Sequence, residues 1–113
     1  MNETIMNTSM EIIISAGDAR LFIHKALKAI AESNYALAAQ EMESAKKKLV
    51  EAHKVHTNII QSEARGEEVE YTVLFTHAQD TLMTINSEME MVKSLIKVFE
   101  SLNDRIKKLE EGK

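Results

Sequence analysis

Two adjacent series of apolar residues run through the last third of the chain, and they constrain the fold more than any other feature of the sequence. The first series consists of Leu74, Ala78, Leu82, Ile85, Met89, Val92, Ile96 and Phe99, and the second of Met91, Leu95, Val98, Leu102, Ile106 and Leu109. Spacings of three and four residues are typical of one face of an α-helix. They predict one helix from Tyr71 or Thr72 to about Glu110, roughly 39 residues and approaching 60 Å in length.

A helix with two apolar stripes needs two covering surfaces. An antiparallel three-helix unit would cover the first stripe only. We therefore expect the third helices of several copies to pack together in a symmetric assembly. The alternative, in which the first two helices cover both stripes, stays open at this point.

The rest of the chain predicts two more helices, over Glu3 to Ala31 and Tyr35 to Ala64. The chain contains no Pro and only three Gly, which favours long helices and leaves little material for β-turns. Either Ser33 or Asn34 can cap the second helix, and Gly66 is suited to end it. The fold class is thus all-α, an antiparallel three-helix bundle in a single domain spanning residues 1–113.

Each of these two helices has an expected core-facing seam. The first runs through Met6, Met10, Ile13, Gly17, Leu21, His24, Leu27 and Ala31, and the second through Tyr35, Ala38, Met42, Ala45, Leu49, Ala52, His56 and Ile59. Gly17 lies inside a helix, where it costs roughly 1 kcal/mol relative to Ala. Close backbone packing at Gly17 and simple tolerance of the residue are both open.

Composition excludes several classes of function. The absence of Cys rules out disulfides and thiolate chemistry, and it is compatible with a reducing cytoplasm. With a net charge of −4 and few aromatic residues, the chain lacks the basic surface and stacking platforms of a nucleic-acid binder. No run of about 18 apolar residues is present. We expect a soluble cytoplasmic protein.

The second apolar series becomes polar when it is extended toward the N-terminus, where it passes through His77 and Asp80. Residues three apart lie on one face of a helix. Neutral imidazole is a good nucleophile near neutral pH and can carry a phosphoryl group on a ring nitrogen. A position close to a helix N-terminus favours the resulting anion. This spacing alone is weak evidence, because a single His in an apolar helix is more often an ordinary hydrogen-bonded residue than a catalyst.

A longer string around His77 resembles a known family. Residues 75–84 read Phe-Thr-His-Ala-Gln-Asp-Thr-Leu-Met-Thr, which is similar to the signature of the lactose/cellobiose-type IIA proteins of the bacterial phosphoenolpyruvate-dependent sugar phosphotransferase system. Residues 14–20, which read Ile-Ser-Ala-Gly-Asp-Ala-Arg, and Glu51 to His53 followed by Thr57 resemble the family's first and second helices. The resemblance covers essentially the whole chain.

The resemblance implies a phosphotransferase component whose His77 accepts a phosphoryl group from the phosphocarrier HPr and passes it to a cysteine of a IIB protein or domain, during uptake of a β-linked disaccharide. The membrane is involved only through the IIC component. It also implies a homotrimer with the third helix at the axis. Asp80 would then meet its symmetry mates around Mg²⁺ or another divalent cation, and Gln79 and His53 would support the phosphoryl site.

Two positions depart from the family pattern: Thr81 stands where His is common, and His56 where Gln is common. The apolar residues Leu74, Phe75, Ala78 and Leu82 are a candidate surface for partner proteins. Two other functions stay open on the sequence, namely a non-catalytic helical adaptor and a bundle that binds a transition metal through His53 or His56. The sequence leaves the sugar unidentified among lactose, cellobiose, chitobiose and other β-glucosides.

Overall fold

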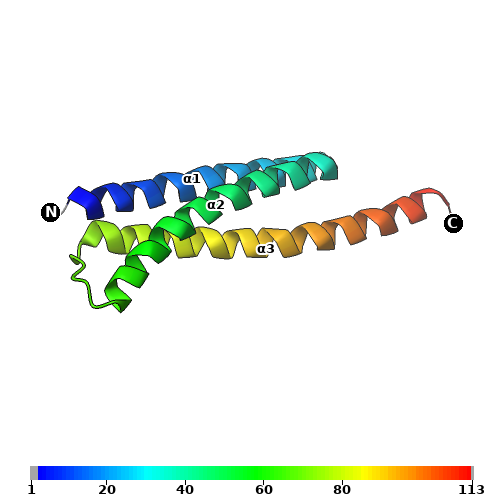
Figure 1. Cartoon of the computed structure of the whole chain (residues 1–113). Helices are drawn as coiled ribbons and strands as arrows, with labels where there is room; N and C mark the ends of the chain where they lie inside the picture. The colour runs from blue at the N-terminus through cyan, green and yellow to red at the C-terminus, as the bar shows by residue number, and fades with distance from the viewer. Residues whose placement is uncertain (1–2, 113) are drawn as a thin grey trace.

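In a computed structural model that describes residues 3–112, the chain forms three long α-helices and no described residue lies in a strand. The helices are α1 (Glu3–Ala31), α2 (Tyr35–Ala64) and α3 (Val73–Glu110). Figure 1 shows that α1 and α3 run in the same direction and α2 runs in the opposite direction, as expected for an antiparallel three-helix bundle. The predicted class and the predicted limits of α1 and α2 are confirmed, and α3 begins just after the predicted Tyr71 or Thr72.

Local side-chain and backbone features explain where the helices begin and end. Asn34 caps α2, since its side chain accepts a hydrogen bond from the backbone N–H of Leu37 at 3.1 Å. Ser33 instead takes a left-handed conformation in the turn, with a φ of 58°. Gly66 has a φ of 85°, as expected of a residue that ends a helix. Thr72 caps α3 by accepting a hydrogen bond from the N–H of Phe75 at 3.0 Å.

The core lies among α1, the central part of α2 and the first part of α3, and small residues of α1 and α2 let these two helices approach closely. The fully buried alanines include Ala16, Ala19, Ala26, Ala38, Ala45 and Ala52. The first predicted series of α3 is confirmed as its core face from Ala78 to Val92, where Ala78, Leu82, Ile85, Met89 and Val92 are buried, whereas Leu74 and Ile96 are only half-buried and Phe99 is exposed. The predicted seam of α2 is confirmed at its centre, where Ala38, Ala45, Leu49 and Ala52 are buried.

The predicted seam of α1 is wrong by one residue. The buried residues of α1 are Ile5, Ser9, Ile12, Ser15, Ala16, Ala19, Ile23, Ala26 and Ala29. Met6, Met10, Ile14 and Leu21 are exposed instead, and we call these four residues the exposed stripe of α1. The reason is steric: α1 turns its small residues toward α2, and the larger side chains are displaced to the neighbouring positions. His24, expected within the seam, is exposed.

Gly17 makes no close approach within the chain, since a Cβ built there would meet no atom within 4 Å. Close intrachain packing at Gly17 is therefore wrong as an explanation of the residue.

The molecule is long and thin, with extents of 67 × 21 × 19 Å and a radius of gyration of 18.5 Å. A compact chain of this length would have a radius of gyration of about 13 Å. Figure 1 shows the cause, because the last turns of α3 extend past the α1–α2 turn. The second predicted series, from Met91 to Leu109, is exposed along the C-terminal half of α3. The alternative in which α1 and α2 cover both stripes is therefore wrong.

An ion pair fixes the register between α1 and α3. The guanidinium group of Arg20 donates two hydrogen bonds to the carboxylate of Glu88, each 2.9 Å long. Both side chains are about two-fifths exposed, so the pair adds little to stability. Its bidentate geometry nevertheless sets the level at which the two helices meet.

Candidate functional site

His77 lies in the second turn of α3 on its exposed face. The side chains at helical positions four apart lie one above the other, so the His77 ring points back toward Val73 and the start of the helix. Val73 is 79% exposed and leaves that approach open. Among the described residues, no hydrogen bond or ion pair involves the His77 ring. The ring is thus accessible to another protein and is not committed to a contact within the chain.

The start of α3 provides a favourable environment for an anion near His77. The first N–H groups of a helix have no partner within it, and the helix dipole places partial positive charge there. Thr72 satisfies the N–H of Phe75. Because the His77 side chain leans toward this end, a phosphoryl group on its ring would lie closer to the positive end of the helix than the His77 backbone does.

Thr81 is bonded to the backbone of the same turn. Its hydroxyl donates a hydrogen bond to the carbonyl oxygen of His77 at 2.8 Å. Such a bond from Thr to the residue four positions earlier is common in helices. Thr81 therefore holds the His77 backbone, and within this chain it is not bonded to the His77 ring.

Asp80 is exposed on the same face of α3 as His77. Within residues 3–112, no cluster of three or more His, Cys, Asp or Glu side chains could hold a metal ion. A metal ion bound by Asp80 would therefore need ligands from outside the described part of a single chain.

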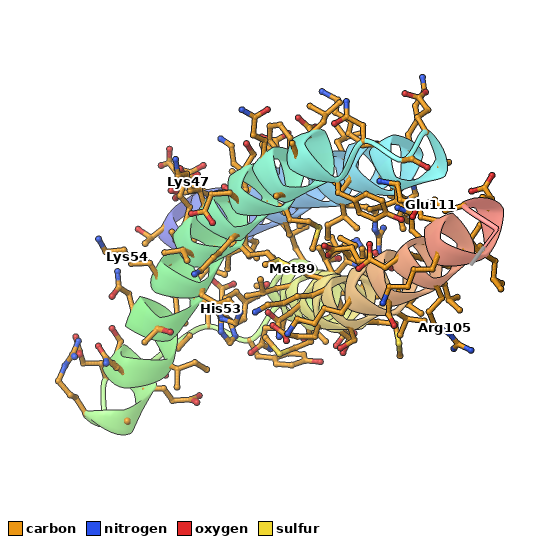
Figure 2. All side chains as sticks on the ribbon, turned by 90° about the vertical axis from the view of Figure 1, so that its right-hand side faces the viewer. Lys47, His53, Lys54, Met89, Arg105 and Glu111 are labelled. Atoms are coloured by element: carbon orange, nitrogen blue, oxygen red, sulfur yellow. The ribbon has the colours of Figure 1, made fainter. Side chains whose placement is uncertain are left out.

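Gln79 and His53 do not lie beside His77 in the single chain. Residues two positions apart on an α-helix are separated by about 200° around its axis, so Gln79 points to the side of α3 away from His77. There its Oε1 lies 2.9 Å from Nε2 of His56. His53 lies between α2 and α3 (Figure 2), with its Nε2 3.5 Å from Oδ1 of Asn86. The partner of Gln79 is thus His56, a contact that the sequence did not predict.

The candidate partner surface of Leu74, Phe75, Ala78 and Leu82 is wrong for most of its residues. Phe75, Ala78 and Leu82 are buried in the core, and only Leu74 is partly exposed. The large apolar side chains that are exposed close to His77 are Tyr71, Val73 and Met83. The spacing of apolar residues along a helix carries no information about the loop before α3, so the exposure of Tyr71 was not predictable from it.

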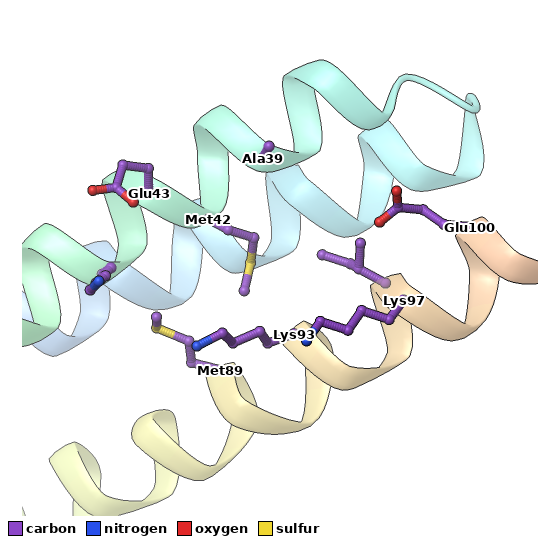
Figure 3. A pocket seen from close by; sticks show the side chains of 9 residues that line it. Ala39, Met42, Glu43, Met89, Lys93, Lys97 and Glu100 are labelled. Carbon is purple, nitrogen blue, oxygen red and sulfur yellow. The ribbon is translucent and has the colours of Figure 1, made fainter.

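A separate groove between α2 and α3 lies away from His77. It is lined by apolar Met42, Met89 and Ile96 and by the lysines Lys46, Lys93 and Lys97, among others. Figure 3 shows Met42 and Met89 reaching toward each other across it, with Lys93 and Lys97 along α3. Because α3 packs mainly on α1, this groove is a gap between helices and not an extension of the site.

Comparison with known proteins identifies relatives over nearly the whole chain. The profile described as "PTS system, Lactose/Cellobiose specific IIA subunit" matches residues 7–100. The lactose-specific EIIA component of Staphylococcus epidermidis is 38% identical over 89 residues, which are 79% of this chain and 86% of that protein.

Two solved structures show the same fold. The cellobiose-specific enzyme IIA of Bacillus anthracis superposes with a TM-score of 0.86 at 36% identity, covering 92% of this chain and 95% of that one. The IIA(chitobiose) protein, solved in complex with HPr, superposes with a TM-score of 0.79 at 30% identity, covering 91% of this chain and 99% of that one. None of the described helices is long and apolar enough to cross a membrane.

Proposed function

The chain belongs to the lactose/cellobiose-specific IIA family of the sugar phosphotransferase system and is a phosphoryl-relay component of that system, and we propose that it carries the phosphoryl group on His77. The observation that carries the assignment is the exposed and unbonded ring of His77 near the start of α3. His24 is also exposed, but it lies on α1 beyond its midpoint and far from any helix start. His53 and His56 are engaged between helices.

The transfer proceeds by exchange of one bond to phosphorus for another. A lone pair on a ring nitrogen of neutral His77 forms a bond to the phosphorus atom of the donor while the bond between that phosphorus and the donor breaks. In the second half, a thiolate of the acceptor attacks the same phosphorus and the bond to His77 breaks. No net oxidation occurs, and the nitrogen returns with its lone pair.

HPr is the proposed donor and the cysteine of a IIB protein or domain is the proposed acceptor, in the cytoplasm. A relative with this fold has been solved together with HPr, which supports the choice of donor. The sugar proposed for the system is a β-linked disaccharide, since relatives are named for lactose and cellobiose. This chain would meet only the protein partners of the relay, so its own site does not distinguish among such sugars.

The proposed assembly is a homotrimer with α3 at its axis, which would cover the exposed series from Met91 to Leu109. The exposed stripe of α1 offers further apolar surface to a neighbouring copy.

Mg²⁺ or another divalent cation is the proposed occupant of the axis at Asp80. Carboxylate oxygens are the ligands such cations prefer, and three carboxylates meeting without one would repel each other. Asp80 fits this role because it is exposed on the face proposed to meet the axis. The ion would hold the three chains in register.

Gln79 and His53 are proposed to support the phosphoryl site from a neighbouring copy. Within one chain, Gln79 points about 200° away from His77 and His53 is bonded to Asn86. In a trimer, the side of α3 that carries Gln79 could face a different copy's His77.

Phosphorylation in a reconstituted relay tests the assignment of His77. The chain is incubated with phosphoenolpyruvate, enzyme I and HPr, and the added mass is measured before and after mild acid. Wild type should gain one acid-labile phosphoryl group per chain, and His77→Ala should gain none because the nucleophile is missing. His24→Ala, a substitution of another exposed histidine, should be labelled like wild type. Full labelling of His77→Ala would exclude His77 as the carrier.

A further inference from the structure

His56 joins α2 to the two turns of α3 that carry the proposed site. Its Nε2 lies 2.9 Å from Oε1 of Gln79, and its ring is stacked on Phe75 with the ring centroids 6.0 Å apart and the planes inclined by 21°. Phe75 is itself buried in the core. The His56 side chain of α2 thus contacts two residues of α3, Phe75 before His77 in the sequence and Gln79 after it.

The orientation of the Gln79 amide is coupled to the tautomer of His56. A carbonyl oxygen accepts hydrogen bonds and cannot donate, so the contact between Nε2 and Oε1 is a hydrogen bond in the tautomer that carries its hydrogen on Nε2. The amide NH₂ group of Gln79 then points away from His56 with two N–H donors, and among the described residues neither donor has a partner. If His56 presented an unprotonated Nε2, the amide would turn over and present its oxygen instead.

We infer that His56 is a positioning residue for phosphoryl transfer, acting through Gln79. This inference rests on the proposed function. In the proposed trimer the Gln79 amide of one copy would face the phosphoryl group on His77 of another, and the two donors that point away from His56 would suit the phosphoryl oxygens, whereas a carbonyl oxygen there would repel them. His56 does not touch the phosphoryl group.

The stacking on Phe75 and the hydrogen bond to Gln79 can be separated by substitution. His56→Phe keeps an aromatic ring against Phe75 and removes the donor. His56→Gln keeps an N–H donor that can reach Gln79 and removes the ring. A role in orienting Gln79 predicts loss of transfer rate in the first variant and rescue in the second, whereas a role in packing predicts the reverse.

The test measures the single-turnover rate of phosphoryl transfer from phosphorylated HPr, together with thermal unfolding of each variant. His56→Phe and Gln79→Ala should each slow transfer about fivefold, as the loss of one hydrogen bond of ordinary strength would. The double variant should be no slower than Gln79→Ala, because His56 acts only through that residue. His56→Gln should remain within about twofold of wild type, and so should His24→Phe, the same substitution at an exposed histidine.

A second readout does not depend on phosphorylation. Nitrogen-15 NMR of the resting protein should show the hydrogen of the His56 ring on Nε2, with a resonance that shifts in Gln79→Ala. A hydrogen on Nδ1, a wild-type rate in His56→Phe, or additive losses in the double variant would each overturn the inference while leaving His77 as the carrier. A wild-type chain that gains no phosphoryl group would overturn the proposed function, and with it any role of His56 in transfer.

Discussion

Thr72 shows how a single residue determines the position of the proposed site. It is 8% exposed, ends the loop in an extended conformation, and bonds the N–H of Phe75 with its side chain. Its carbonyl oxygen accepts hydrogen bonds from the backbone N–H and the hydroxyl of Thr76. Since helix α3 starts from these bonds, Thr72 sets the turn on which His77 falls.

Replacing Thr72 with Ala should therefore destabilise the protein by about 1 kcal/mol, the usual cost of losing such a cap. Urea denaturation followed by circular dichroism measures the change. Thr57→Ala is the matched control, because Thr57 is exposed inside α2 and Ala is the better helix former there. Equal stability of the Thr72 and Thr57 variants would mean that the cap does not hold the start of α3.

At this scale, the sequence predicted the positions of the proposed site residues on α3 better than their contacts. His77 and Asp80 share the exposed face of α3, as their spacing of three residues indicates. The bond between Gln79 and His56 was not predictable, because it depends on how α2 crosses α3. Helical spacing specifies the neighbours within a helix and does not specify those across two helices.

At the scale of the helices, burial separates the two faces of α3 sharply. Ile85 is completely buried in the core, whereas residues of the second series such as Val98 and Ile106 are about half exposed. The first face holds the three helices of one chain together. The second contributes little to the fold of a single chain.

Ile85→Ala should cost about 2–4 kcal/mol, because it removes three buried carbons and leaves a cavity between α1 and α3. Ile60→Ala is the control, since Ile60 is 43% exposed on α2, and it should change stability by about 0.5 kcal/mol or less. Chemical denaturation of both variants gives the comparison. Similar losses at the two positions would contradict the assignment of the core face.

The limits of the helices were predictable because they depend on local chemistry, such as the cap at Asn34 and the left-handed Gly66. The buried face of α1 was missed because large apolar residues were taken to mark it. Its actual core positions include Ser9, Ser15 and Ala16, which permit close packing of helices but carry a weak hydrophobic signal. Which of two adjacent faces becomes buried is decided by the partner helix.

At the scale of the whole molecule, the elongated shape and the uncovered stripes of α1 and α3 indicate a chain that is incomplete alone. Apolar side chains extend along the exposed face of α3 from Met91 to Leu109. Monomeric proteins rarely expose contiguous apolar surface on this scale. A partner copy on this face would bury it.

Asp80→Leu tests the proposed axis. Exchanging a cluster of like charges for apolar packing should preserve or strengthen the assembly and remove its dependence on divalent cations. Sedimentation with and without EDTA gives the mass, which should fall on EDTA treatment for wild type but not for Asp80→Leu. Asp104→Leu, at another exposed aspartate of α3, should behave like wild type. Dissociation of Asp80→Leu into folded monomers would place Asp80 away from the axis.

The Arg20–Glu88 ion pair joins residues 68 positions apart and has a consequence for the order of events during synthesis. The α1–α2 hairpin closes through a short local turn at Ser33 and Asn34, so its residues are all present before α3 is made. At translation rates of about 5–20 residues per second, the hairpin can exist for a time on the order of seconds before α3 docks on α1. The turn that carries His77 therefore gains its place against α1 only after the α1–α2 hairpin has been made.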